Sequence, residues 1–234
     1  MLYYSPFDIY YIALVLPAAL FALFCQFRVT STFKKYARIR TRRGITGEQA
    51  AARVCALGEA RHVSVKAIAG NLTDHFNPKD NVISLSQSVY GESSVAAVGV
   101  AAHEAGHAAQ YAQGYGPVKL RAGILPVTRV ASMLALPLIL IGFAVEGMPV
   151  LVNIGILLFG VAFLFQLLTL PVEFDASRRA LAILESGGML DGDELRGAKR
   201  VLSAAAMTYV AAMAVSLMQL IRVILLAQSR GRRR

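Results

Sequence analysis

The pentapeptide His-Glu-Ala-Gly-His at residues 103–107 is the strongest chemical signal in the sequence. On a helix, positions four apart face the same side, so His103 and His107 can reach one metal ion. Glu104 lies beside the first histidine and can hold a water molecule bound to that ion. Imidazole is a good ligand for Zn²⁺, and a catalytic zinc ion keeps an open position for water. The spacing therefore predicts a zinc centre that activates water.

A catalytic zinc ion needs a third protein ligand, which zinc hydrolases take from another His or from a Glu on a later helix. The candidates are His62, His75, Glu92, Glu173 and Asp175. Glu173 and Asp175 follow an apolar stretch directly. If Glu173 is the ligand, Asp175 or Ser177 could hydrogen-bond a zinc-bound imidazole. The alternative for Glu173 is charge compensation at a helix N-terminus that begins after Pro171.

Composition and charge indicate a membrane protein. Of the 234 residues, 56% are hydrophobic and 16% are charged, against about 45–50% and about 25% in soluble domains. The net charge is +10, and the basic clusters flank apolar stretches, as the positive-inside bias and anionic lipids require. The largest cluster comprises Arg28, Lys34, Lys35, Arg38, Arg40, Arg42 and Arg43. We therefore expect membrane lipid as a partner and no nucleic acid.

Four apolar segments predict a helical membrane bundle of about four spans, since a spanning helix needs about 20 mostly apolar residues. They cover residues 7–27, 127–145, 150–170 and 201–227. The first is expected to be an uncleaved anchor, and a tight turn at residues 146–149 makes a hairpin of the second and third. Pro126 and Pro137 are expected to kink or bound the second segment. Because Arg222 interrupts the fourth, that segment either spans, which we favour, or lies along the inner surface.

The polar region between the first two apolar segments predicts a small α+β domain. A capping box at Thr46 and Gln49 opens a helix that ends near Gly58. Alternation predicts a strand over residues 63–67, and the turn at residues 77–80 predicts a returning strand over 82–86. Ser93 or Ser94 then caps a helix that runs to about Gln113 and carries the zinc motif. Residues 83–86 are either an edge to which an extended substrate adds, or half of a buried hairpin.

The sequence resembles the YugP-type membrane zinc metallopeptidases over nearly its whole length. The shared motifs, in order, are Gly-Asn-Leu-Thr-Asp-His-Phe-Asn-Pro at 70–78, Leu-Ser at 85–86 with Val-Tyr at 89–90, the zinc motif followed by Ala-Ala-Gln, Glu-Phe-Asp-Ala-Ser at 173–177, and Ala-Ala-Met-Thr-Tyr-Val-Ala at 205–211. It is more distantly similar to the HtpX-like and CAAX-processing proteases. Those proteases place an Asp four residues after the ligand Glu, where this chain has Ser177, so Asp175 could take over that role.

The resemblance implies an integral-membrane, zinc-dependent peptidase of the gluzincin type. Its metal ligands would be His103, His107 and Glu173, with Glu104 as the base. Gluzincins stabilise the oxyanion of the reaction with a His or Tyr donor, for which His75 and Tyr209 are the candidates. The alternatives are a turn residue for His75 and an interfacial aromatic anchor for Tyr209.

Together these observations predict a mostly α integral membrane protein, with about four spans and a small α+β zincin-like cytosolic domain. We expect a multi-pass protein of the cell (inner) membrane whose active site faces the cytoplasm, because the Lys and Arg residues that set orientation lie on that side. The expected divisions are an anchor and basic segment (1–43), the zincin-like domain (44–119), the membrane hairpin (120–171), a cytosolic helix with the third ligand (172–200) and a C-terminal apolar helix with a basic tail (201–234).

The function that we expect is that of a zinc metalloendopeptidase, with Zn²⁺ as cofactor and protein or peptide substrates. The main alternative is a zinc-binding membrane adaptor or assembly factor without peptidase activity. Glu104 argues against it, because a purely structural metal site needs no base. A metal-handling protein is disfavoured because, apart from Asp8 at the start of the first, no His, Asp or Glu lies in the apolar segments. The sequence leaves open a homo-oligomer or a membrane-protein partner.

Overall fold

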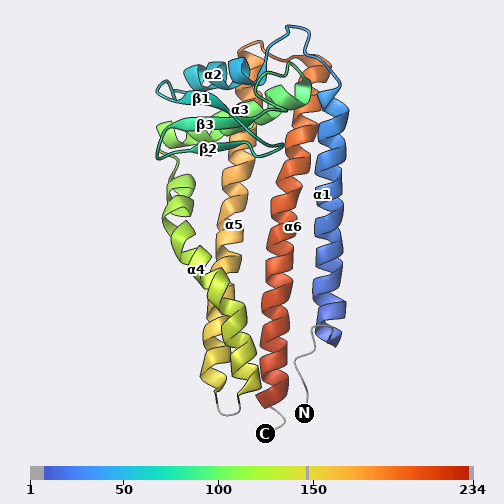
Figure 1. Ribbon diagram of the computed structural model, residues 1–234, viewed down its shortest axis with the longest axis vertical. Helices are drawn as coiled ribbons and strands as arrows, with labels where there is room; N and C mark the ends of the chain where they lie inside the picture. The colour runs from blue at the N-terminus through green and yellow to red at the C-terminus, as the bar shows by residue number, and fades with distance from the viewer. Residues whose placement is uncertain (1–7, 146–147, 232–234) are drawn as a thin grey trace. The chain divides into compact units, whose positions relative to one another are not determined.

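The computed structural model describes residues 8–145 and 148–231 and divides into two compact units (Figure 1). The described parts of Met1–Cys25, Leu120–Leu170 and Thr208–Arg234 form the first unit. Gln26–Lys119 and Pro171–Met207 form the second. The chain is mostly helical with one small sheet, as predicted.

The predicted apolar segments all lie in long helices. Among the described residues, four stretches are long and apolar enough to cross a membrane. They are a π-helical turn η1 (Tyr11–Val15) continued by α1 (Leu16–Ala37), and then α4 (Gly116–Ala144), α5 (Pro149–Ser186) and α6 (Gly192–Gly231). Pro126 and Pro137 both lie inside α4, so neither bounds that helix.

In the first unit, α4 and α5 pack side by side (Figure 1). A Cβ atom added at Gly155 would lie 2.4 Å from Cγ1 of Ile139, and one added at Gly142 would lie 2.7 Å from Cγ2 of Val152. Small residues that allow such close approach are typical of helix contacts in membranes. The two helices therefore pack together as the predicted hairpin requires, and Glu146 and Gly147 of the predicted turn lie outside the described residues.

An ion pair in the same unit connects the start of the first apolar segment with α6. The Arg222 side chain is 3% exposed, and its Nη2 atom lies 2.6 Å from Oδ2 of Asp8. Its guanidinium carbon also lies 5.2 Å from the centre of the Tyr11 ring. The cation that interrupts the fourth apolar segment is thus neutralised inside the protein.

The two helices predicted in the polar region are confirmed, together with their caps. For α2 (Gly47–Leu57), the Thr46 hydroxyl accepts from the backbone N–H of Gln49, and the Gln49 side chain accepts from that of Thr46. For α3 (Val95–Ala112), the cap is Ser94, whose hydroxyl accepts from the Ala97 N–H at 3.2 Å. Both caps are local interactions and can be read from the sequence.

The two predicted strands pair with each other, but they run parallel, so the predicted hairpin between them is wrong. The sheet contains β1 (Ser64–Ile68), β2 (His75–Asn77) and β3 (Val82–Ser86) in the order β1-β3-β2. β3 runs parallel to β1 and antiparallel to β2. The turn at residues 77–80 connects β2 to β3. A parallel connection needs about a dozen residues or more, and the segment between β1 and β3 is long enough to provide them. β3 is consequently the central strand and offers no edge to a substrate, which contradicts the first of the two interpretations of residues 83–86.

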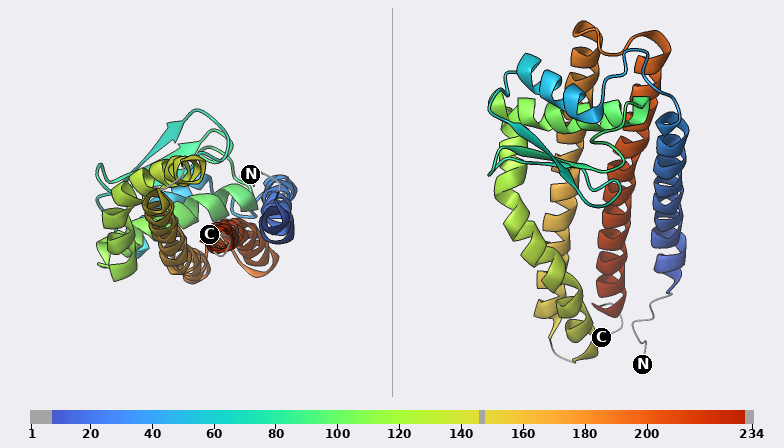
Figure 2. Two further views of the ribbon diagram at one scale, coloured as in Figure 1. Left: turned by 90° about the horizontal axis from the view of Figure 1, so that it is seen from below. Right: turned by 45° about the horizontal axis from the view of Figure 1, so that its top comes forward.

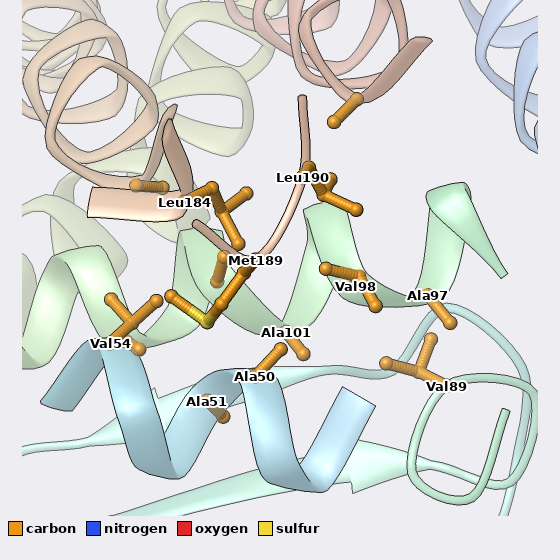
Figure 3. Close-up of a cluster of buried hydrophobic side chains, with 14 of the residues drawn as sticks. Ala50, Ala51, Val54, Val89, Ala97, Val98, Ala101, Leu184, Met189 and Leu190 are labelled. Carbon is orange, nitrogen blue, oxygen red and sulfur yellow. The ribbon is translucent and has the colours of Figure 1, made fainter. Parts of the chain in front are cut away.

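The core of the second unit lies between α2, α3 and the segment that joins α5 to α6 (Figure 3). Alanines such as Ala50 and Ala101 bring α2 and α3 together, and both helices also contact the sheet (Figure 2). Leu184 and Met189, both fully buried, close the core from the other side. The ends of α5 and α6 therefore complete the core that the small α+β region could not build alone.

Candidate metal centre

Two helices of the second unit bring together two histidines and a glutamate. His103 and His107 occupy successive turns of α3, and Glu173 lies on α5. Oε2 of Glu173 lies 3.3 Å from Nε2 of His103 and 3.5 Å from Nε2 of His107. The glutamate side chain is 2% exposed, and the histidine side chains are 16% and 12% exposed. The three side chains converge from opposite helices on one shielded point.

The geometry of these donors fits a zinc ion. Their ligand atoms all lie within 4.8 Å of one another. With zinc–ligand bonds of 2.0–2.2 Å and tetrahedral angles, two donor atoms are separated by about 3.4 Å. The two histidine–glutamate distances match that separation, and two imidazoles with one carboxylate are a donor set of catalytic zinc sites. His103, His107 and Glu173 could therefore hold a metal ion.

A glycine sets the distance between the two helices at this point. A Cβ atom added at Gly106 would lie 2.4 Å from the carbonyl oxygen of Ala176. Gly106 lies between the two histidines in the sequence, and Ala176 lies between Glu173 and Ser177. The two helices therefore approach closely at the centre of the site, and packing requires a glycine at position 106.

Replacing Gly106 with alanine is expected to push α3 and α5 apart, because a methyl group cannot occupy a position 2.4 Å from a backbone oxygen. We expect a loss of about 1–3 kcal/mol in the free energy of unfolding, as for other overpacked sites, together with weaker zinc binding. Denaturant unfolding and zinc titration measure the two effects. Gly160→Ala is the control, because a Cβ atom at Gly160 on α5 meets nothing within 4 Å. Equal behaviour of the two variants would contradict this account.

The orientation of His107 is fixed by Gln110, which is fully buried. The Gln110 Nε2 atom donates to the carbonyl oxygen of Val172 at 2.8 Å and to Oδ2 of Asp175 at 2.9 Å. Its Oε1 atom therefore faces Nδ1 of His107, at 3.0 Å. Since a carbonyl oxygen can only accept, Nδ1 of His107 carries the proton and Nε2 presents its lone pair to the metal position.

Ser177 and Asp175 contact the site in different ways. The Ser177 hydroxyl lies 3.1 Å from Nδ1 of His103, so it contacts one imidazole directly. Asp175 is 6% exposed and reaches His107 through Gln110, while Arg178 and Arg179 bind its carboxylate. Sequence reasoning missed Gln110. Its position three residues after His107, on the same side of the helix, was the available signal.

The electrostatics around His107 favour a cation. Burial lowers the pKa of His107, but the hydrogen bond and the negative charge of Glu173 raise it more, and the charge of Glu104 adds to this effect. The net result is a pKa above the ordinary value for histidine. Glu104, partly buried on α3, therefore contributes to the negative potential at the site. Two carboxylates beside two imidazoles attract a divalent cation.

The other candidate residues are not among these three donors. His75 is exposed on β2, and its Nδ1 atom lies 2.9 Å from the carbonyl oxygen of Thr73. Tyr209 lies on α6, in the first unit. His62 and Glu92 are exposed on loops. Among the residues that the structure describes, the group that could hold a metal consists of His103, His107 and Glu173.

The helix-terminus interpretation of Glu173 is wrong. α5 continues without interruption from Pro149 to Ser186, with Pro171 inside it. Glu173 therefore has a full helix before it and cannot compensate an N-terminal dipole there.

Comparison with known proteins finds a family and a relative that match most of this chain. The model of a family described as "Putative neutral zinc metallopeptidase" matches residues 11–228. The chain is 43% identical, over 216 residues, to the "Putative membrane protease YugP" of Bacillus subtilis (strain 168). The aligned residues cover 92% of this chain and 96% of that protein. No solved structure matches. The chain therefore belongs to the family described as putative neutral zinc metallopeptidases.

Proposed function

We propose that the protein is a membrane-embedded zinc endopeptidase, with His103, His107 and Glu173 as metal ligands and Glu104 as the general base. The observation that carries this proposal is the convergence of the two Nε2 atoms and the Glu173 carboxylate at 3.3 and 3.5 Å. Glu104 adjoins the first ligand on the same helix, where a base must lie to serve water at the metal. The α+β region of the second unit would act as a zincin-like domain of the gluzincin type.

A zinc ion held by His103, His107 and Glu173 would polarise the scissile carbonyl and make a water molecule more acidic. Glu104 would accept a proton from the attacking water and return it to the leaving amine. Gln110 and Ser177 hold the two imidazoles with Nε2 toward the metal, as their contacts with the Nδ1 atoms support. His75 and Tyr209 remain the candidates for the oxyanion donor.

The proposal is tested by measuring zinc content and peptide cleavage on the same purified sample of the full chain. We expect about one zinc ion per chain and cleavage of an unfolded protein such as casein. A chelator should remove both, and added zinc should restore both, because the cofactor and the ligand set belong to one site. Stoichiometric zinc without cleavage would contradict the peptidase proposal and favour an adaptor.

We also propose that four helices span the membrane and that the metal site faces the cytoplasm. Residues 9–27, between Asp8 and Arg28, are uncharged and make about 28 Å of helix, while residues 201–221 are uncharged and make about 31 Å. Both lengths match a hydrocarbon core of about 30 Å. Because Asp8 and Arg222 form an ion pair, we place both charges together at the outer boundary of the hydrocarbon core. Arg222 then marks the end of a span instead of lying deep in the bilayer.

A single cysteine at position 229 is expected to react with a membrane-impermeant thiol reagent added to intact spheroplasts. The Ser229→Cys change is made after Cys25→Ala and Cys55→Ala, so that no other thiol reacts. In the same background, Lys66→Cys on β1, exposed in the second unit, should react only after lysis. Protection at both positions before lysis would leave three spans, with the C-terminal segment on the inner side.

A further inference from the structure

The end of α1, the segment that follows it and the start of α6 line a basic cavity in the second unit. Its volume is about 290 Å³, at the lower end of the range for small-molecule sites. Its cationic lining residues are Lys35, Arg40, Arg42, Arg196 and Arg200. The metal site does not share any of these residues. We propose that this cavity binds the phosphate headgroup of an anionic phospholipid.

The charge of the lining favours an anion. Two carboxylates, Asp193 and Glu194, accompany the five cations. Asp193 forms an ion pair with Arg196, and Glu194 accepts from the backbone N–H of Arg42 at 2.6 Å. Glu194 is also buried, at 6% exposure. Arg42 also pairs with Asp191 at 3.4 Å, so the positive charge available to a phosphate group comes mainly from Lys35, Arg40 and Arg200.

The base of the cavity is built around Tyr36, which is 7% exposed. Its hydroxyl lies 3.0 Å from Nη1 of Arg200, and the ammonium group of Lys35 lies 5.7 Å from the centre of its ring. A Cβ atom added at Gly197 would lie 2.8 Å from that ring, so Tyr36 packs directly against the α6 backbone. One buried ring therefore holds two of the cations in place, which reduces the cost of ordering them on binding.

Two features of the lining favour a lipid over other phosphate compounds. Lys35 lies in the last turn of α1, about 12 Å of helix beyond the uncharged residues 9–27, and Arg200 directly precedes the uncharged residues 201–221, so both lie near the ends of these uncharged stretches. Ile39 also lines the cavity although its side chain is 43% exposed. An exposed apolar side chain among cations suits the glycerol and acyl part of a phospholipid. Basic pockets between membrane helices bind anionic headgroups in this manner.

The test measures lipid binding to the full chain in neutral detergent by native mass spectrometry. We expect phosphatidylglycerol to bind in preference to phosphatidylcholine. The double variant Lys35→Gln/Arg40→Gln should bind phosphatidylglycerol roughly 30-fold more weakly, at about a fivefold loss per cation. The control is Arg61→Gln/Lys66→Gln, which removes the same two residue types at exposed positions outside the cavity. A similar loss in the control would show diffuse surface attraction and overturn the proposal.

A second arm separates a lipid from free phosphate. Ile39→Ser should weaken the binding of phosphatidylglycerol several-fold. The concentration of inorganic phosphate needed to compete with the lipid should not change. If inorganic phosphate displaced phosphatidylglycerol at equal concentration, the cavity would be a phosphate site and the lipid proposal would be wrong. Lipid binding is measured without a peptide substrate, so Glu104→Gln should leave it unchanged. The lipid proposal can therefore be tested whether or not the protein is a peptidase.

Discussion

Replacing Glu104 with glutamine is expected to leave zinc content unchanged and to lower the rate of peptide hydrolysis by about 10²–10⁴-fold, the usual contribution of a general base. The amide has nearly the same shape as the carboxylate but cannot accept a proton from water. Glu104 is not among the three residues whose donor atoms converge on the metal position, so the metal should remain. Zinc analysis and kcat/KM for an unstructured peptide, measured on the same sample, test both parts.

Two further variants are the controls for the Glu104→Gln experiment. His103→Ala should lose zinc and activity together, because it removes a ligand. Glu92→Gln should lose neither, since Glu92 is an exposed acid on a loop. If Glu104→Gln hydrolysed the peptide at the wild-type rate, Glu104 would not be the base, and an adaptor that merely contains zinc would become the better interpretation.

The elements that could be predicted from the sequence are those fixed by neighbouring residues. Thr46 and Gln49 cap α2, and Ser94 caps α3, within three residues of the groups that they bind. The pairing of β1 with β3 depends instead on contacts between segments far apart along the chain. β2 has only three residues, too few for an alternating pattern to reveal it, so the antiparallel partner was assigned to the wrong segment.

The same distinction applies to the metal site. His103 and His107 lie on one helix, and their shared face follows from helix geometry alone. Glu173 lies on a different helix, so residue types alone left five candidates for the third ligand, and only the family resemblance singled one out. Gln110 was missed because its role depends on Val172 and Asp175, which α5 brings to it. The packing role of Gly106 likewise depends on Ala176, which lies on α5.

Glu173→Ala is expected to lower zinc affinity by more than the roughly 10–100-fold that follows the loss of a residue orienting a ligand. It removes one of three donors, and the only negative charge among them. Asp175→Ala and Gln110→Ala should each fall within the 10–100-fold range, because they leave all three donors in place. Titration against a competing chelator measures the affinities. Glu185→Ala, which removes an exposed acid from the same helix, should have no effect, and a larger loss for Asp175→Ala than for Glu173→Ala would make Asp175 the ligand.

The hydrogen bonds also predict how these effects combine. Asp175 contacts His107 through Gln110, so removing both Asp175 and Gln110 should cost little more than removing Gln110 alone. Ser177 contacts the other imidazole, at Nδ1 of His103, so the effect of Ser177→Ala should add to that of Gln110→Ala. If the losses of zinc affinity do not add for Asp175 with Gln110 but do add for Ser177 with Gln110, the two histidines are oriented by separate hydrogen bonds. Full additivity of Asp175→Ala and Gln110→Ala would mean that Asp175 acts on the metal site by another route.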